Sequence, residues 1–234
     1  MIRISDLKKV YRTDEVETVA VANANLRVDA GEFVAITGPS GSGKTTLLTI
    51  LGLLDYPTQG EYYLLGEEVS KLSEKRRADL RRNNIGFVFQ NFNLINELTV
   101  YENIELPLLH MGVPSSQRKE MVAAIMEQMH ITTRRNHFPR QLSGGQQQRA
   151  AVARAVVGKQ PLILADEPTG NLDSRNGEEV MNLLARLNEE GTTLIMVTHS
   201  REYAGWANRI VQLFDGHIAN ENITEGARSA LELH

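Results

Sequence analysis

The chain has 234 residues, a formal net charge of −4 and no cysteine. Its length suffices for one large α/β domain, its weak negative charge gives no reason to expect bulk nucleic-acid binding, and without cysteine it has no disulfide or thiolate chemistry. No apolar run approaches the ~20 residues that a membrane-spanning helix needs, and the first six residues do not resemble a secretion signal. We therefore expect a chain that crosses no membrane by itself and works in the cytoplasm.

The first segments predict a half-exposed antiparallel sheet, because residues 2–10 and 16–28 alternate loosely between apolar and polar side chains. Tyr11 lies between these two predicted strands, where an aromatic side chain by itself usually indicates packing. Residues 33–36 form a short apolar run, which predicts a buried strand.

A glycine-rich segment follows this strand and reads Gly-Pro-Ser-Gly-Ser-Gly-Lys-Thr-Thr over residues 38–46. It matches the phosphate-binding loop and runs into an apolar helix at 47–51. A strand, a glycine turn and a helix N-terminus direct backbone N–H groups at one point, where the helix dipole adds positive charge. Lys44 can reach the β- and γ-phosphates of a nucleotide, and the Thr45 hydroxyl can bind Mg²⁺. We therefore predict a nucleoside triphosphate site formed by Gly38, Pro39, Ser40, Gly41, Ser42, Gly43, Lys44, Thr45 and Thr46.

A basic helix is predicted at residues 73–84, after a turn at 57–60 and a strand at 61–65. Ser73 is a suitable N-cap for this helix. We interpret the basic face as solvated, in preference to a contact with a membrane or partner, and its members are Lys75, Arg76, Arg77, Arg81 and Arg82.

A strand at residues 85–89 ends in Gln90, and a helical region follows from about 99 to 140. We expect Pro107, the segment 112–114 and Pro139 to break this region into pieces. Apolar residues at helical spacing over 121–129 indicate a core position and not a cofactor site.

A second glycine turn precedes a helix in the segment 141–149, which reads Gln-Leu-Ser-Gly-Gly-Gln-Gln-Gln-Arg. Ser143 can cap the helix, so Ser143, Gly144, Gly145 and Gln146 form a second candidate anion site. One nucleotide does not obviously need two such sites in one subunit.

Two further buried strands end in polar residues that suit phosphate chemistry. The strand at 161–165 ends in Asp166 and Glu167, and the strand at 192–198 ends in His199. The carboxyl ends of parallel strands face the crevice in which α/β folds bind ligands. Asp166 suits Mg²⁺, Glu167 suits orienting or deprotonating a water molecule, and His199 can reach a γ-phosphate.

The remaining segments predict secondary structure, and we assign no catalytic or binding residues to them. Residues 176–190 predict an amphipathic helix, and a hairpin is predicted from 210–214 and 217–219 around Asp215-Gly216. We expect one domain over residues 1–222 and a weakly helical tail over 223–234, to which we assign no function.

These motifs occur in an order that resembles the nucleotide-binding subunit of ABC transporters: the phosphate-binding loop, Gln90, 142–146, 162–167, Asp173 and His199. The resemblance covers about residues 2–219. Phosphate-binding loops occur in many ATPases and kinases, whereas Leu-Ser-Gly-Gly-Gln followed by Asp-Glu-Pro is particular to this class. The implied fold is the P-loop NTPase α/β fold of ABC ATPases, with a parallel-sheet core, an antiparallel β-subdomain and a helical subdomain at about 91–160.

The resemblance also implies the reaction, ATP + H₂O to ADP and phosphate, and a role for each motif residue. Catalytic roles fall to Lys44, Gln90, Glu167 and His199. Mg²⁺ binding falls to Thr45 and Gln90, with Asp166 acting through water. ATP binding falls to Tyr11, which would stack on adenine, to the phosphate-binding loop, and to Ser143, Gly144, Gly145, Gln146 and Asp173. In this family two subunits pack head to tail, so that the second glycine turn of one closes over the ATP of the other.

Within the class the chain is similar to the MacB/LolD/FtsE group, on features such as Gly60-Glu61-Tyr62, Asn103–Leu106 and Asp166–Ser174. It is nearest to the MacB type, because Leu142–Arg149 is more like MacB than LolD. Two departures are Thr45 in place of the commoner serine and Ser200 in place of aspartate after the histidine. The implied partners are a second ATPase subunit, an integral membrane permease contacted near Gln90–Leu109 and, through the permease, a periplasmic adaptor. The implied location is the cytoplasmic face of the inner membrane.

Two alternatives stay open. One is an FtsE-like regulatory ATPase that controls envelope enzymes without transport. The other is an ABC ATPase that acts on DNA or ribosomes, although such chains usually carry a coiled-coil insertion or two fused cassettes, which this sequence lacks.

Overall fold

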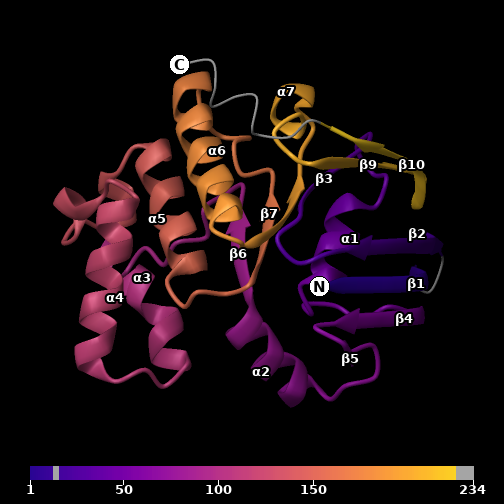
Figure 1. The fold of residues 1–234 in the computed structure, drawn as a ribbon, viewed down its shortest axis with the longest axis horizontal. Coiled ribbons are helices and arrows are strands. Elements are labelled where there is room, and N and C mark those ends of the chain that lie inside the picture. The colour runs from indigo at the N-terminus through magenta and orange to yellow at the C-terminus, as the bar shows by residue number, and fades with distance from the viewer. Residues whose placement is uncertain (13–15, 225–234) are drawn as a thin grey trace.

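The computed structural model describes residues 1–12 and 16–224 and contains two sheets (Figure 1). The antiparallel sheet has the order β2 (Glu17–Val28), β1 (Ile2–Arg12), β4 (Gln59–Leu64) and β5 (Glu67–Glu68). The larger sheet has the order β10 (His217–Ile223), β9 (Arg209–Phe214), β3 (Phe33–Thr37), β8 (Thr193–Val197), β7 (Leu162–Asp166) and β6 (Ile85–Phe89). All strands of the larger sheet run parallel except β10, which pairs antiparallel with β9.

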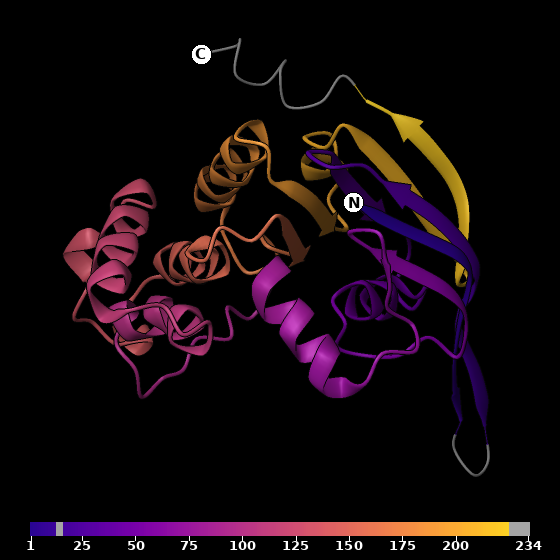
Figure 2. The same ribbon diagram turned by 60° about the horizontal axis from the view of Figure 1, so that its bottom comes forward.

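The helices of the described residues surround the larger sheet (Figure 1). They are α1 (Lys44–Leu51), α2 (Glu74–Asn84), α3 (Val100–His110), α4 (Ser115–Gln128), α5 (Gly144–Val156), α6 (Ser174–Glu189) and α7 (Arg201–Ala204), with short 3-10 turns at Thr132–Arg134 and Pro139–Gln141. In Figure 2, α3 and α4 stand on the side away from the antiparallel sheet, whose β1–β2 hairpin projects from the body. The expected parallel core, β-subdomain and helical region are confirmed.

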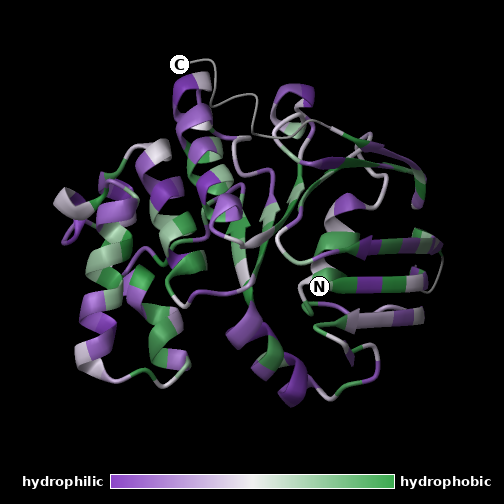
Figure 3. Ribbon diagram, viewed as in Figure 1, coloured by the Kyte–Doolittle hydropathy of each residue, from purple (hydrophilic) through white to green (hydrophobic). Residues whose placement is uncertain are grey.

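The strands of the larger sheet are apolar runs because both faces of the sheet are covered. In β3, Phe33 and Ala35 join the core cluster under the helical region, whereas Val34 and Ile36 join the cluster between the two sheets. Strands β7 and β8 alternate in the same way. Figure 3 shows this central sheet as mainly hydrophobic and α2 as mainly hydrophilic.

Pro107 does not break the helical region as predicted, because α3 continues through it to His110. A capping box between Thr99 and Glu102 stabilises the start of α3. Ile104 and Leu108 are fully buried in the core, and this burial offsets the cost of proline inside a helix. The other predicted breaks hold: Gly112-Val113-Pro114 separates α3 from α4, and Pro139 begins a 3-10 turn.

The predicted solvated face of α2 is wrong at Arg77, which is 1% exposed. Its guanidinium stacks on the Tyr56 ring at 3.5 Å and donates to the carbonyl of Asp55. Arg81 donates to the carbonyl of Leu53. The loop after α1 has carbonyls that need donors, and these two arginines supply them, whereas Arg76 stays exposed beside Glu67.

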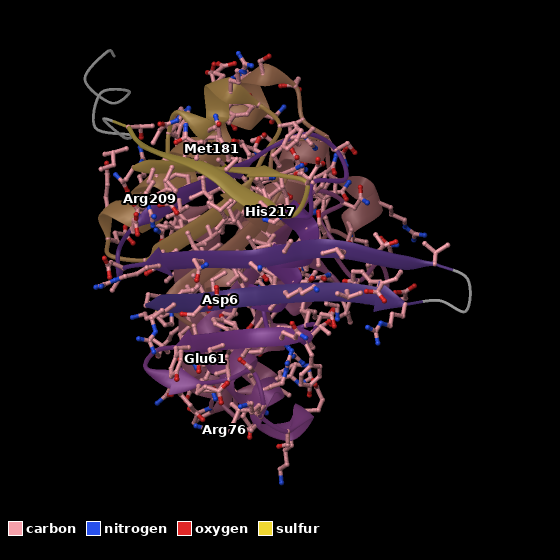
Figure 4. The ribbon with its side chains drawn as sticks, turned by 90° about the vertical axis from the view of Figure 1, so that its right-hand side faces the viewer. Asp6, Glu61, Arg76, Met181, Arg209 and His217 are labelled. Atoms are coloured by element: carbon pink, nitrogen blue, oxygen red, sulfur yellow. The ribbon has the colours of Figure 1, made fainter. Side chains whose placement is uncertain are left out.

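Smaller differences concern element ends. Strand β4 begins at Gln59, inside the predicted turn, and β10 continues to Ile223, the first residue of the predicted tail. The tail from residue 225 onwards lies outside the described residues. Figure 4 views the antiparallel sheet from outside, with Asp6 on β1 and Glu61 on β4.

Candidate functional site

The strand order brings the predicted site residues to one edge of the larger sheet. Strands β3, β8, β7 and β6 are parallel neighbours, so their carboxyl ends lie side by side. The phosphate-binding loop follows β3, His199 follows β8, Asp166 and Glu167 end β7, and Gln90 follows β6. They share a cleft of about 780 Å³, which is lined by Thr18, Val19, Ala20, Ser40, Gly41, Gly43, Lys44, Thr45, Thr46, Gln90, Asp166, Glu167, Thr169, Gly170, Val197, Thr198, His199, Ser200 and Tyr203.

The phosphate-binding loop is held in a conformation that requires glycine. Gly43 is the N-cap of α1 with φ of 97°, and a Cβ atom there would lie 2.0 Å from the carbonyl oxygen of Ala20. The Lys44 ammonium donates to the carbonyl oxygens of Gly38 at 3.0 Å and Pro39 at 2.8 Å. Burial lowers the pKa of Lys44, and the nearby carboxylates of Glu167 and Asp166 only partly oppose this shift. The loop therefore presents a desolvated cation and a helix N-terminus to the cleft, which suits phosphate.

Glu167 has a left-handed backbone, with φ of 48°, directly after β7. Its N–H donates to the carbonyl of Val197 at 2.9 Å, so the neighbouring strand fixes the turn. The carboxylate lies 3.2 Å from Nε2 of His199 and accepts from the His199 N–H at 3.3 Å. Such an uncommon conformation in a non-glycine residue is typical of functional sites.

The Asp166 carboxyl is partly buried and interacts with the Thr45 side chain. Burial raises the pKa of Asp166, while the hydrogen bond with Thr45 and the charge of Lys44 oppose the shift. Carboxylate, hydroxyl and amide oxygens are ligands that Mg²⁺ prefers, so Asp166, Thr45 and Gln90 fit this ion. Within the described residues there is no group of three or more His, Cys, Asp or Glu that could hold a metal. A Mg²⁺ ion here would therefore rely on Thr45, water and phosphate oxygens as well as on Asp166.

Gln90 is tied to the loop that follows Glu167. Its side-chain amide donates to Oδ1 of Asn171 at 3.3 Å, and Asn171 donates back to the Gln90 carbonyl at 3.0 Å. A Cβ atom on Gly170 would lie 2.7 Å from Nε2 of Gln90. The end of β6 and the carboxylates of β7 are thus coupled through one short loop.

The second glycine turn lies outside this cleft, since none of Ser143, Gly144, Gly145 and Gln146 lines it. Ser143 caps α5 and accepts from the Gln146 N–H at 3.4 Å, as the sequence predicts. Gly145 packs so closely on α6 that a Cβ atom would lie 2.0 Å from Oδ1 of Asn176. Asp173 also lies outside the cleft and caps α6 through the Asn176 N–H at 2.9 Å. That bond, followed by the one from the Asn176 side chain, lowers the pKa of Asp173.

Tyr11 does not line the cleft directly, although its cross-strand partner Thr18 does. The phenol is 43% exposed and donates to Oδ2 of Asp55 at 2.9 Å. Gly38, Pro39 and Ser42 belong to the phosphate-binding loop but do not line the cleft. The carbonyls of Gly38 and Pro39 accept from the Lys44 ammonium, and Ser42 is buried.

Several lining residues were not predicted. Thr169 and Gly170 follow Glu167 within three positions, so their place next to the motif was the available signal. Thr18, Val19 and Ala20 come from β2, and Ser200 and Tyr203 from the start of α7. Ser200 directly follows His199 in the sequence, whereas the other four carry no motif and reach the cleft only through tertiary packing.

Comparison with known proteins gives consistent results. Residues 21–170 match the family model described as "ABC transporter". The chain is 50% identical to the uncharacterized ABC transporter ATP-binding protein MJ1508 of Methanocaldococcus jannaschii, over 93% of this chain and 97% of that one. It is 46% identical to the macrolide export ATP-binding/permease protein MacB of Brucella melitensis, over 94% of this chain but 34% of that one.

A solved structure agrees with the fold. The dimeric ATP-binding cassette MJ0796, in a post-hydrolysis state bound to ADP and Pi, matches with a TM-score of 0.90 and 43% identity, over 97% of this chain and 100% of that one. In the part of the chain that the structure describes, the helices are too short or too polar to cross a membrane. The chain belongs to the ABC transporter family and is an ATP-binding subunit that hydrolyses ATP.

Proposed function

We propose that this ATPase forms a head-to-tail dimer, with a second copy or a homologous subunit, and drives a membrane permease of the MacB/LolD type. One observation supports the dimer. The segment Ser143–Gln146 forms a capped helix N-terminus, and it lies outside the cleft that the phosphate-binding loop lines. Two such chains packed head to tail would place this N-terminus on the phosphates held by the partner. Asp173, at the exposed start of α6, would lie at the same interface.

Within each composite site the cleft residues take the roles that their geometry suits. Lys44 and the loop amides would stabilise charge on the phosphoryl oxygens. Mg²⁺, held by Thr45, Gln90 and Asp166, would supply further neutralisation of that charge when bound. Glu167 would position and polarise the attacking water, His199 would contact the γ-phosphate, and Gln90 would contact the water and ion. Tyr11 would stack on the adenine base.

The permease would dock in a groove of about 660 Å³ between α2, β6, α3 and α5. Its floor is apolar, with Phe87, Phe89 and Leu106, and includes Pro107. Its lining also includes the cations Lys75, Arg81, Arg82 and the partly buried Arg154, beside a single carboxylate, Asp79. The charge balance favours a cytoplasmic segment with an apolar face and acidic ends. Docking there would place the ATPase on the cytoplasmic face of the inner membrane, with a periplasmic adaptor reached through the permease.

The transport classes that we propose are export, efflux, or lipoprotein and peptide handling. The similarity to proteins named macrolide export ATP-binding/permease protein MacB favours export among them, since the chain is 44–46% identical to several of these over 33–35% of their length. An FtsE-like regulatory ATPase that controls envelope enzymes would use the same cleft and groove. The two functions differ in the partner that the groove binds.

The test is to identify the partner. The Glu167→Gln variant with ATP would be purified from detergent-solubilised membranes of the native host, and co-purifying proteins identified by mass spectrometry. The Glu127→Gln variant, changed at an exposed site on α4, is the matched control. A permease enriched with Glu167→Gln supports the transport proposal. Division or cell-wall proteins would move the assignment to the regulatory ATPase, and ribosomes or DNA-repair proteins without a permease would refute both.

A further inference from the structure

The phenol ring of Tyr11 lies at the edge of the nucleotide cleft and is held by residues that no motif identifies. Tyr11 pairs across the strands with Thr18, and its hydroxyl interacts with the Thr46 side chain. Thr18 and Thr46 both line the cleft. The ring is therefore next to the loop that binds phosphates and is open enough, at 43% exposed, to receive a planar ligand.

Asp55 is the centre of the contacts that hold this ring. It lies in the loop between α1 and β4 and accepts three hydrogen bonds: from the Tyr11 hydroxyl at 2.9 Å, the Lys9 ammonium at 2.7 Å and the Tyr56 N–H at 2.7 Å. Burial alone would raise the pKa of Asp55, but these bonds, that from Lys9 first, lower it overall. The group that accepts from Tyr11 is thus a carboxylate at neutral pH, and bonds to charged acceptors are stronger than neutral ones.

Lys9 covers one face of the same ring. Its ammonium lies 4.8 Å from the Tyr11 ring centroid and also donates to the Tyr56 carbonyl at 2.8 Å. The Lys9 side chain is only 12% exposed, so it is fixed by these contacts. With one face covered by a bound cation, a base can stack only on the opposite face.

The loop that carries Asp55 is itself anchored. Buried Arg77 of α2 donates to the Asp55 carbonyl, and its guanidinium stacks on the ring of Tyr56. Tyr56 in turn donates from its hydroxyl to Glu74 at 3.2 Å. The carboxylate that accepts from Tyr11 is therefore presented from a rigid turn.

We propose that Asp55 and Lys9 are positioning residues that hold the Tyr11 ring ready to stack on the nucleotide base. This inference rests on the proposed base-stacking role of Tyr11. A ring restrained before binding loses less conformational entropy when the base arrives, so the restraint increases affinity. For Asp55 the gain should apply to the base alone, because its carboxylate binds Tyr11, Lys9 and the Tyr56 N–H. The Tyr11 hydroxyl also contacts Thr46 of the phosphate-binding loop, so Asp55→Asn is the sharper variant.

The experiment compares a ligand that has a base with one that has none. Binding of ADP and of inorganic pyrophosphate, each with Mg²⁺, would be measured by calorimetry for Asp55→Asn, Tyr11→Phe, their double variant and Tyr11→Ala. Asp55→Asn keeps the size of the side chain, and Tyr11→Phe keeps the ring. Two matched controls are used. Tyr63→Phe changes a tyrosine of the same sheet whose ring packs under Arg3, and Asp29→Asn changes an aspartate just after β2 that pairs with Arg27.

We expect each single variant to bind ADP about fivefold more weakly, which is the size of the cost of ordering one side chain on binding. Pyrophosphate affinity should stay within about twofold of the unmodified protein. The double variant should lose little more than Tyr11→Phe alone, because Tyr11→Phe already removes the hydroxyl that donates to Asp55. Both controls should bind ADP normally.

Three results would overturn the inference. Equal losses for ADP and pyrophosphate would show that Asp55 only supports the fold. Unchanged ADP binding in Asp55→Asn and Tyr11→Phe, with a loss in Tyr11→Ala, would leave the base-stacking role intact and remove the positioning role. Unchanged ADP binding in Tyr11→Ala would refute the base-stacking role itself, and the positioning role with it.

Discussion

Nε2 of His199 lies 3.2 Å from Oε1 of Glu167, although 32 positions separate the two residues. The contact exists because β7 and β8 are parallel neighbours, paired from Leu162 with Thr193 to Asp166 with Val197. A carboxylate that can act on water and an imidazole that can reach a terminal phosphate therefore sit at one sheet edge. The backbone N–H of His199 also donates to Oε2 of Glu167, which restrains the carboxylate within the cleft.

Replacing Glu167 by glutamine should uncouple binding from hydrolysis. Glutamine keeps the shape of the side chain but cannot accept a proton from water, so turnover should fall by about 100-fold or more. ATP binding should remain, and the variant should accumulate as an ATP-bound dimer in size-exclusion chromatography with light scattering. Steady-state hydrolysis near the level of the Glu127→Gln control would contradict the catalytic role of Glu167.

Asp166 should make the protein less stable at neutral pH in the absence of Mg²⁺. Burial raises the pKa of Asp166 in the folded state, so the folded protein holds this proton more tightly than the unfolded chain. Ionisation of Asp166 then costs stability, and the cost grows as the pH rises above the unfolded value of about 3.9. Asp166→Asn should therefore unfold at a higher temperature than the unmodified protein at pH 7.

The pH dependence of unfolding distinguishes the cost of ionising Asp166 from a stabilisation by asparagine that does not depend on pH. The advantage of Asp166→Asn should shrink as the pH falls and disappear below the unfolded pKa, as followed by circular dichroism in buffers without Mg²⁺. Asp29→Asn, at an exposed site, should show no such trend. A lower unfolding temperature for Asp166→Asn at pH 7 would show that the charge is stabilising after all.

Arg77 should matter far more to stability than its neighbour Arg76. Truncating the 1%-exposed Arg77 leaves the Asp55 carbonyl without this donor and opens a space against Tyr56, so Arg77→Ala should lower the unfolding free energy by about 3 kcal/mol. Arg76→Ala removes only an exposed ion pair with Glu67 and should change the unfolding free energy far less. Equal midpoint shifts of the two variants in urea unfolding would contradict the buried role of Arg77.

Pro107 should reduce the stability of α3 without being needed for its fold. A proline at this position gives the helix no N–H, so Pro107→Ala should add a helix hydrogen bond and stabilise the protein by about 1 kcal/mol. Thermal unfolding measures the gain, and ATP hydrolysis by the isolated subunit should not change. A loss of stability would show that the surrounding packing is built around the proline ring.

The sequence predicted the strands that end at the cleft because parallel strands covered on both faces are continuous apolar runs, and Phe33–Ile36 and Leu162–Ala165 are such runs. It also predicted the caps of α2 and α5, since Ser73 and Ser143 act through neighbours three residues away. Apolar strands, helix caps and the phosphate-binding loop can all be identified from the spacing of nearby residues alone.

What the sequence alone did not decide depends on contacts between distant segments. Whether Arg77 is solvated depended on a loop more than 20 positions away, and Pro107 lies inside a helix because core packing outweighs local preference. Likewise, Asp55 reaches Tyr11, and Thr18 reaches the cleft, only through the pairing of β1 with its neighbours. The sequence by itself determined which residues are the candidates for the chemistry, because motif spacing is local. The tertiary structure decided what surrounds and supports them, because burial and long-range hydrogen bonds depend on which strands become neighbours.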